Sequence, residues 1–244
     1  MRRRDGRKTW SLKKLGRCEA AIAVCDEGIA KYGADLSITI EKDIAWLLVY
    51  KAGELDKLGR HDEELATYDE IIRRWEEASL PELRQRVSKA RFDRAITLVD
   101  LGRIDEAIEA YTQGAGDIRA SDVKTATNGA CSANNLGILL RKNGRVPEAI
   151  SWHQRVLDTC DRDHPGLREQ IGVAHGGLAR AYVARGDNQR ALAAMDAALA
   201  MPAGTYGAGL PKALAEERAA LAPVPAKVTF NGPGMKLIRW IQGK

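Results

Sequence analysis

The chain has 244 residues and a formal net charge of +5, and 45% of its residues are hydrophobic while only 5% are aromatic. This composition is typical of a helical protein filled with small aliphatic side chains, and it excludes a largely disordered chain. No apolar run approaches the roughly 20 residues that a membrane-spanning helix needs, so we expect a cytoplasmic protein.

Five glycines recur at a nearly constant spacing. Gly16, Gly59, Gly102, Gly144 and Gly186 stand 43, 43, 42 and 42 residues apart, and arginine follows the first four. A fixed period of this length indicates one supersecondary unit copied along the chain, in which each unit buries its apolar face against its neighbours. The sequence therefore predicts a repeat array over residues 1–203, rather than a domain with one central core.

The first predicted unit, at about 1–35, is the least regular. Residues 1–17 carry eight Lys or Arg and one Asp, a net charge of +7, which leaves −2 for the rest of the chain. Such a segment could bind nucleic acid or an anionic surface, although a solvated terminus is the simpler interpretation. The irregular unit also leaves open that the chain is a fragment, or a start-shifted copy, of a longer array.

Four further units follow, at about 36–78, 79–120, 121–163 and 164–203. In the second unit, Leu48 and Leu55 precede Gly59, and Leu65 and Ile72 follow it, at the spacing of amphipathic helices. Glycine suits the left-handed residue just past a helix C-terminus, because it has no Cβ to strain that conformation. We therefore predict a helix, a turn at the glycine and a second helix in each unit.

Two packing positions recur after each glycine. The position five residues later is small in four units and charged in the second, where Glu64 occupies it. A small side chain there lets the paired helices approach closely. The position nine residues later holds a larger side chain in every unit: Cys25, Tyr68, Tyr111, His153 and Met195.

The periodic pattern stops after Gly204, and residues 204–244 are predicted to form an irregular C-terminal cap. A short helix from Pro211 to Leu221 precedes a stretch broken by proline, and a final helical segment contains Trp240. Repeat arrays need an atypical end that covers their last helix pair. The alternative is a membrane-surface helix, because Trp240 lies among basic residues, but the segment is short and weakly basic.

These features resemble the tetratricopeptide repeat family, in the long-period form of about 42 residues seen in kinesin-light-chain-like and bacterial repeats. The segment Ala133-Asn134-Asn135-Leu136, with Asn143-Gly144-Arg145 and Glu148-Ala149, is especially similar to that form. The resemblance implies an all-α fold: a right-handed superhelical solenoid of five antiparallel helix pairs with a C-terminal helical cap.

No catalytic or cofactor motif is present in the sequence. The four histidines fall at spacings that do not suggest a shared metal ion, and the four cysteines form no CxxC pair. The glycine-rich segment Gly172–Gly177 lies within a predicted helix without a preceding strand, so close packing explains it better than nucleotide binding. We therefore expect no enzyme activity, no cofactor and no metal ligand.

In the resembled family, the first helices of the pairs line a concave groove that holds a peptide or a partner helix. The same positions here would be Trp46, Val49, Lys57, Lys89, Phe92, Asn134, Ile138, Arg141, Lys142 and Arg180. Asn134 is the strongest candidate, because a carboxamide can pair with both groups of a bound backbone. Arg141 and Arg180 could hold a carboxylate. The alternative is that these polar side chains are solvated or bond within the array.

The sequence thus favours a protein-interaction adaptor or scaffold that binds a protein or peptide partner, with acidic peptides or chain termini preferred. Binding of nucleic acid through the basic N-terminus is disfavoured but stays open. A third alternative is a regulatory fragment of a larger multidomain protein or enzyme. The sequence does not identify the partner or the oligomeric state.

Overall fold

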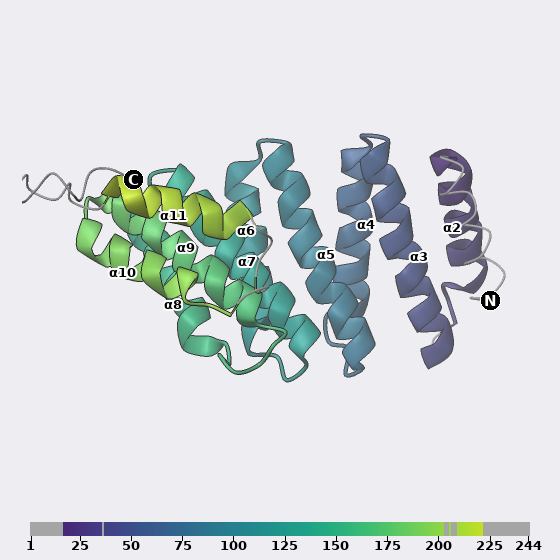
Figure 1. Cartoon of the computed structure of the whole chain (residues 1–244). Coiled ribbons are helices and arrows are strands. Elements are labelled where there is room, and N and C mark those ends of the chain that lie inside the picture. The colour runs from purple at the N-terminus through teal and green to yellow at the C-terminus, as the bar shows by residue number, and fades with distance from the viewer. Residues whose placement is uncertain (1–16, 36, 203–204, 206–208, 222–244) are drawn as a thin grey trace, which may run out of the picture.

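The computed structural model describes residues 17–35, 37–202, 205 and 209–221, and every regular element in these ranges is helical. The chain is an all-α solenoid, as the sequence predicts (Figure 1). The basic segment and the helix predicted ahead of Gly16 lie outside the described residues, apart from Arg17.

The helices follow one another with short turns between them. The α-helices are α2 (Cys18–Tyr32), α3 (Ile38–Lys57), α4 (His61–Trp75), α5 (Pro81–Asp100), α6 (Ile104–Ala115), α7 (Val123–Lys142), α8 (Val146–Thr159), α9 (Arg168–Arg185), α10 (Asn188–Leu199) and α11 (Gly209–Leu221), and a 3₁₀ helix, η1 (Gly116–Arg119), follows α6.

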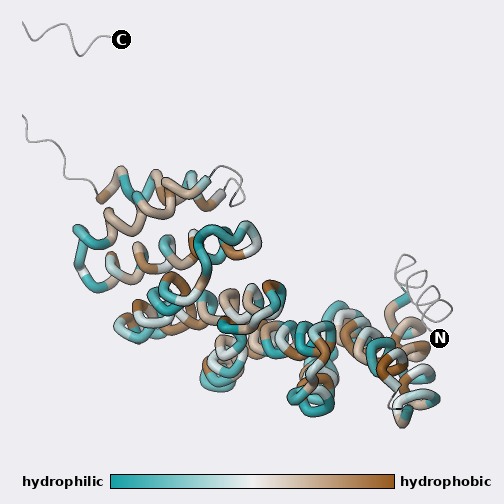
Figure 2. The backbone as a smooth tube through the Cα atoms, turned by 90° about the horizontal axis from the view of Figure 1, so that it is seen from below, coloured by the Kyte–Doolittle hydropathy of each residue, from teal (hydrophilic) through white to brown (hydrophobic). Residues whose placement is uncertain are grey.

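The helices form a stack that follows a curved path (Figure 2). Each helix packs against the next one in the chain, and α3, α5, α7 and α9 are the first helices of four successive pairs. Neighbouring first helices also touch one another, whereas the second helices α4, α6, α8 and α10 make no comparably close contacts among themselves within the described residues. The first helices therefore line the inside of the curve, and we call their exposed side the inner face.

The glycine turns have the predicted left-handed conformation. Gly59, Gly102, Gly144 and Gly186 have φ between 68° and 80°, and they are the only described residues with a positive φ. At the first of these turns, the backbone N–H of Arg60 donates to the carbonyl of Leu55 at 3.0 Å, and that of Gly59 donates to the next carbonyl. The same pair of bonds recurs at the other three turns. These bonds satisfy carbonyls that a helix end otherwise leaves unpaired.

The arginine that follows three of these glycines starts the second helix of the pair. Its backbone carbonyl accepts the first hydrogen bond of that helix, and its guanidinium binds a glutamate three residues later at 2.6–2.7 Å. The pairs are Arg60–Glu63, Arg103–Glu106 and Arg145–Glu148. The glutamate lies in the first helical turn, where a negative charge is favoured. At the fourth turn Asp187 takes the place of arginine, and its side chain accepts from the backbone N–H of Arg190.

Alanine at the predicted small position lets the paired helices approach closely. Ala107, Ala149 and Ala191 are each fully buried, and the larger side chains four residues later in the sequence are buried as well. The second pair departs from this pattern because Glu64, only 2% exposed, occupies the small position. A carboxylate there is costly unless it is hydrogen-bonded, and its partners are described below.

Helix α11 covers the last helix pair and is the described part of the predicted cap (Figure 1). Leu214 is fully buried against α9 and α10, close to Gly176, and Arg218 pairs with Asp196 of α10. The predicted final segment around Trp240 lies outside the described residues. None of the described helices is long and apolar enough to cross a membrane.

Candidate functional site

One hollow lies on the inner face between α3 and α5. It has a volume of about 190 Å³ and is lined by Lys42, Ala45, Trp46, Glu82, Leu83 and Arg86. The indole of Trp46 stacks on Tyr50 with ring centroids 5.1 Å apart, which fixes the aromatic side chain at the edge of the hollow. Lys42 pairs with Glu82 across the two helices at 3.0 Å. Trp46 is thus the predicted site residue that the structure places in this hollow.

The other predicted residues of the first half are engaged within the array. Lys57 pairs with Glu54 of its own helix at 2.5 Å. Lys89 pairs with Asp93 and lies over the ring of Phe92, which itself packs near Tyr111 with ring centroids 6.2 Å apart. Val49 is half-buried and packs against the core around α3 and α4. These contacts leave Trp46 as the strongest candidate contact residue in this half.

A second hollow lies between α7, α9, α10 and α11. Its volume is about 370 Å³ and its lining is mostly apolar: Arg141, Arg180, Val183, Ala184, Met195, Glu217, Ala220 and Leu221. Arg141 and Arg180 come from successive first helices, so the structure brings together two residues that the sequence predicted for one surface. Arg141 and the neighbouring Lys142 make no ion pair with any described residue, and Arg141 gives this hollow a positive edge.

Arg180 already binds a carboxylate within the chain. Its Nε lies 3.1 and 3.2 Å from the two carboxylate oxygens of Glu217, and its Nη2 lies 2.9 Å from one of them. Glu217 belongs to α11, so the cap supplies the acidic group that the sequence led us to expect from a ligand. This two-point geometry is typical of an arginine–carboxylate pair.

Asn134 is buried, whereas the sequence led us to expect it in the groove. It is 1% exposed and bonded within the array. Its amide nitrogen donates to the backbone carbonyl of Gln170 at 2.9 Å, and its amide oxygen lies 3.1 Å from Nδ1 of His153. Because both ends of the carboxamide are occupied by α8 and α9, Asn134 cannot bind a ligand backbone without breaking these bonds. Ile138, one turn further along α7, is half-buried.

His153 is a core residue held between two glycines. A Cβ on Gly137 would lie 2.6 Å from the imidazole, and one on Gly177 would lie 2.3 Å from it. With the Asn134 oxygen as acceptor, Nδ1 carries the proton, and Nε2 has no partner among the described residues. Burial, with a smaller contribution from the charge of Arg141, lowers the pKa of His153 to about 4. The imidazole is therefore neutral at physiological pH.

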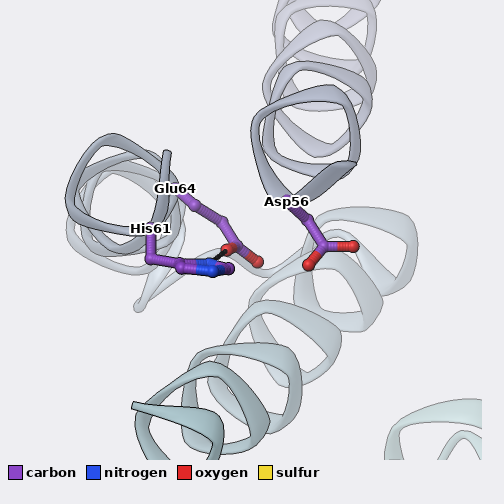
Figure 3. Close-up of side chains that lie close together, drawn as sticks. All are labelled: Asp56, His61 and Glu64. Carbon is purple, nitrogen blue, oxygen red and sulfur yellow. Dashed lines mark hydrogen bonds and ion pairs between the residues drawn. The ribbon is translucent and has the colours of Figure 1, made fainter. Parts of the chain in front are cut away.

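A polar cluster lies away from these hollows, at the turn between α3 and α4 (Figure 3). It consists of Asp56, His61 and Glu64, each of which offers one ligand-type atom, and these atoms lie within 4.8 Å of one another. Nδ1 of His61 is 3.0 Å from the Glu64 carboxylate. This hydrogen bond raises the pKa of His61, and the negative charges of Glu64, Asp56 and Asp100 act in the same direction. No sequence motif predicted this cluster.

Part of the repeat array matches the model of a known family. Residues 130–202 match the family model described as tetratricopeptide repeat (TPR). The chain is a TPR-like protein. No curated protein matches the sequence of this TPR-like chain.

Solved structures share the fold of this TPR-like protein. BtubC (BKLC) from P. vanneervenii is 20% identical, with a TM-score of 0.60 over 89% of this chain and 80% of its own. A kinesin-light-chain protein from Podosopora anserina with nearly identical TPR-like repeats is 17% identical, with a TM-score of 0.55 over 82% of this chain and 94% of its own. These likenesses show a common helical solenoid.

Proposed function

We propose that this TPR-like protein is an interaction scaffold, not an enzyme, and that its inner face binds an extended polypeptide segment. The observation that supports this proposal is that residues of the first helices line two hollows, one between α3 and α5 and the other between α7 and α9, which α10 and α11 also line. A ligand that reaches both must run along the face past α5 and α7. An extended segment of a partner protein has that shape, whereas a compact small molecule does not.

The chemistry of the second hollow favours an acidic segment or a chain terminus. Val183, Ala184 and Leu221 offer apolar contact, and Arg141 has no anionic partner among the described residues. A carboxylate that reached Arg141 would make a charge-assisted hydrogen bond beside an apolar surface, where such bonds are strong. Arg180 contributes less, because Glu217 already neutralises it. In the first hollow, Trp46 would hold an apolar side chain.

A displayed library of random peptides tests this function without knowledge of the natural partner. We expect selected peptides to contain an acidic residue or to require a free C-terminus, and to bind with an affinity that anisotropy titration can measure. The substitution Arg141→Glu should weaken their binding by at least about tenfold, since charge reversal removes an attraction and adds a repulsion.

The matched control is Arg73→Glu, which makes the same charge change at an exposed residue of the second helix α4. This variant should bind the selected peptides as the parent does. Equal losses in both variants, or no loss in either, would contradict binding at the inner face. Failure to select any peptide would contradict the proposed function itself.

A further inference from the structure

The cluster at the α3–α4 turn has the donor atoms of a metal site. Asp56 lies in the last turn of α3, and His61 and Glu64 lie one turn apart at the start of α4, with their side chains directed into the space between the two helices (Figure 3). The closest pair, Nδ1 of His61 and a carboxylate oxygen of Glu64, is 3.0 Å apart. That separation is close to the spacing of two ligands at about 2 Å from one ion.

The repeat itself shows that these three residues are unusual. They stand three residues before, two after and five after the turn glycine. The corresponding residues are Val99, Ile104 and Ala107 in the next unit, Arg141, Val146 and Ala149 in the one after it, and Val183, Asn188 and Ala191 in the last. Only the second unit places a ligand-type side chain at all three positions. The other units pack their helices without ligand-type side chains at all three positions. Helix packing therefore does not explain this set.

The buried member of the cluster is oriented for a ligand role. Glu64 is 2% exposed, and one of its oxygens accepts from Oγ1 of Thr97 on α5 at 2.9 Å. The other oxygen faces His61. An outer hydrogen bond of this kind fixes the direction of a metal-binding carboxylate. Asp56 is exposed at the end of α3, so its side chain can turn toward an ion in the cluster without displacing core residues.

We propose that Asp56, His61 and Glu64 form a binding site for a divalent first-row transition metal ion. One imidazole nitrogen and two carboxylate oxygens suit zinc, which takes such ligands with a fourth position open to water. The ion would sit between the end of α3 and the start of α4, with Thr97 of α5 as the outer support. Binding would replace the hydrogen bond between His61 and Glu64 with two bonds to the ion.

The alternative is a purely structural cluster, in which Glu64 is held by His61 and Thr97 and no ion binds. The two interpretations differ in what a chelator titration measures. Zinc competition against a chromogenic chelator should give one site per chain in the full-length protein, and cobalt should give the visible absorption of a four-coordinate ion. The substitution His61→Ile or Glu64→Ala should weaken zinc binding by at least about tenfold.

These substitutions are chosen so that the fold is preserved. Ile104 and Ala107 fill the same positions in the next unit, and the helical circular dichroism of both variants should match that of the parent. The control is His164→Ala, which removes an imidazole of the loop between α8 and α9 and should leave zinc affinity unchanged. Absence of zinc binding in the parent would overturn the proposal. So would equal affinity in the parent and the His61→Ile variant, or an equal loss in the His164→Ala control.

Discussion

At the scale of single residues, polar side chains inside the array decide how neighbouring pairs fit together. His153 fills the space that Gly137 and Gly177 leave free, and Asn134 connects it to the backbone of α9. A side chain at either glycine would have to displace the ring. The three elements α7, α8 and α9 are therefore matched to one another through a single imidazole.

This arrangement predicts an acid-sensitive contribution to stability. An exposed imidazole in the unfolded chain has a pKa near 6.5, and that of folded His153 is lowered to about 4. The unfolded state therefore binds the proton first, so the stabilisation is complete above about pH 6.5 and is lost as the pH falls toward 4. Between pH 7 and pH 5 the loss should be on the order of 1–2 kcal/mol.

The variant His153→Met isolates this effect, because Met195 occupies the same position in the last unit. It should be less stable than the parent at pH 7, since the buried oxygen of Asn134 loses its donor. The difference should shrink as the pH is lowered to 5. Urea unfolding at both pH values measures the two differences. Parallel pH dependence in parent and variant would show that His153 does not titrate as its burial requires.

At the scale of elements, each helix pair from α3 onward depends on a left-handed glycine turn. Glycine spacing predicted these turns from sequence because the requirement is local: at each turn, the bonded groups belong to residues close together in the chain. The helices could be predicted from apolar periodicity for the same reason, because helical hydrogen bonds also join residues close together in the chain. The contact between α11 and Arg180 could not be predicted in this way, because Glu217 lies 37 residues away and outside the periodic pattern.

Two alanine substitutions test the role of these turns. Gly102→Ala should destabilise the protein by about 1 kcal/mol, because alanine disfavours the left-handed conformation. A Cβ on Gly53, in the interior of α3, meets no atom within 4 Å. Gly53→Ala should therefore stabilise the protein by about 0.5–1 kcal/mol. Denaturant unfolding of both variants measures whether each substitution raises or lowers the free energy of unfolding. Equal changes would indicate that the turn conformation has no energetic role.

At the scale of the whole molecule, the stack presents one continuous inner face. Sequence reasoning assigned Trp46, Arg141 and Arg180 to this face, and all three line its hollows. It could not show that Asn134 is buried, because that depends on the helix that packs against it from the next unit. The cluster at the α3–α4 turn was also missed, although a comparison of equivalent positions between units reveals it.

Hydrogen exchange of the chain with and without a selected peptide is the most direct test of binding at the inner face. We expect slower exchange in the first helices α3, α5, α7 and α9 and in α11, with α4 and α6 unchanged. Protection confined to the second helices, or to the turns on the outside of the curve, would contradict binding at this face.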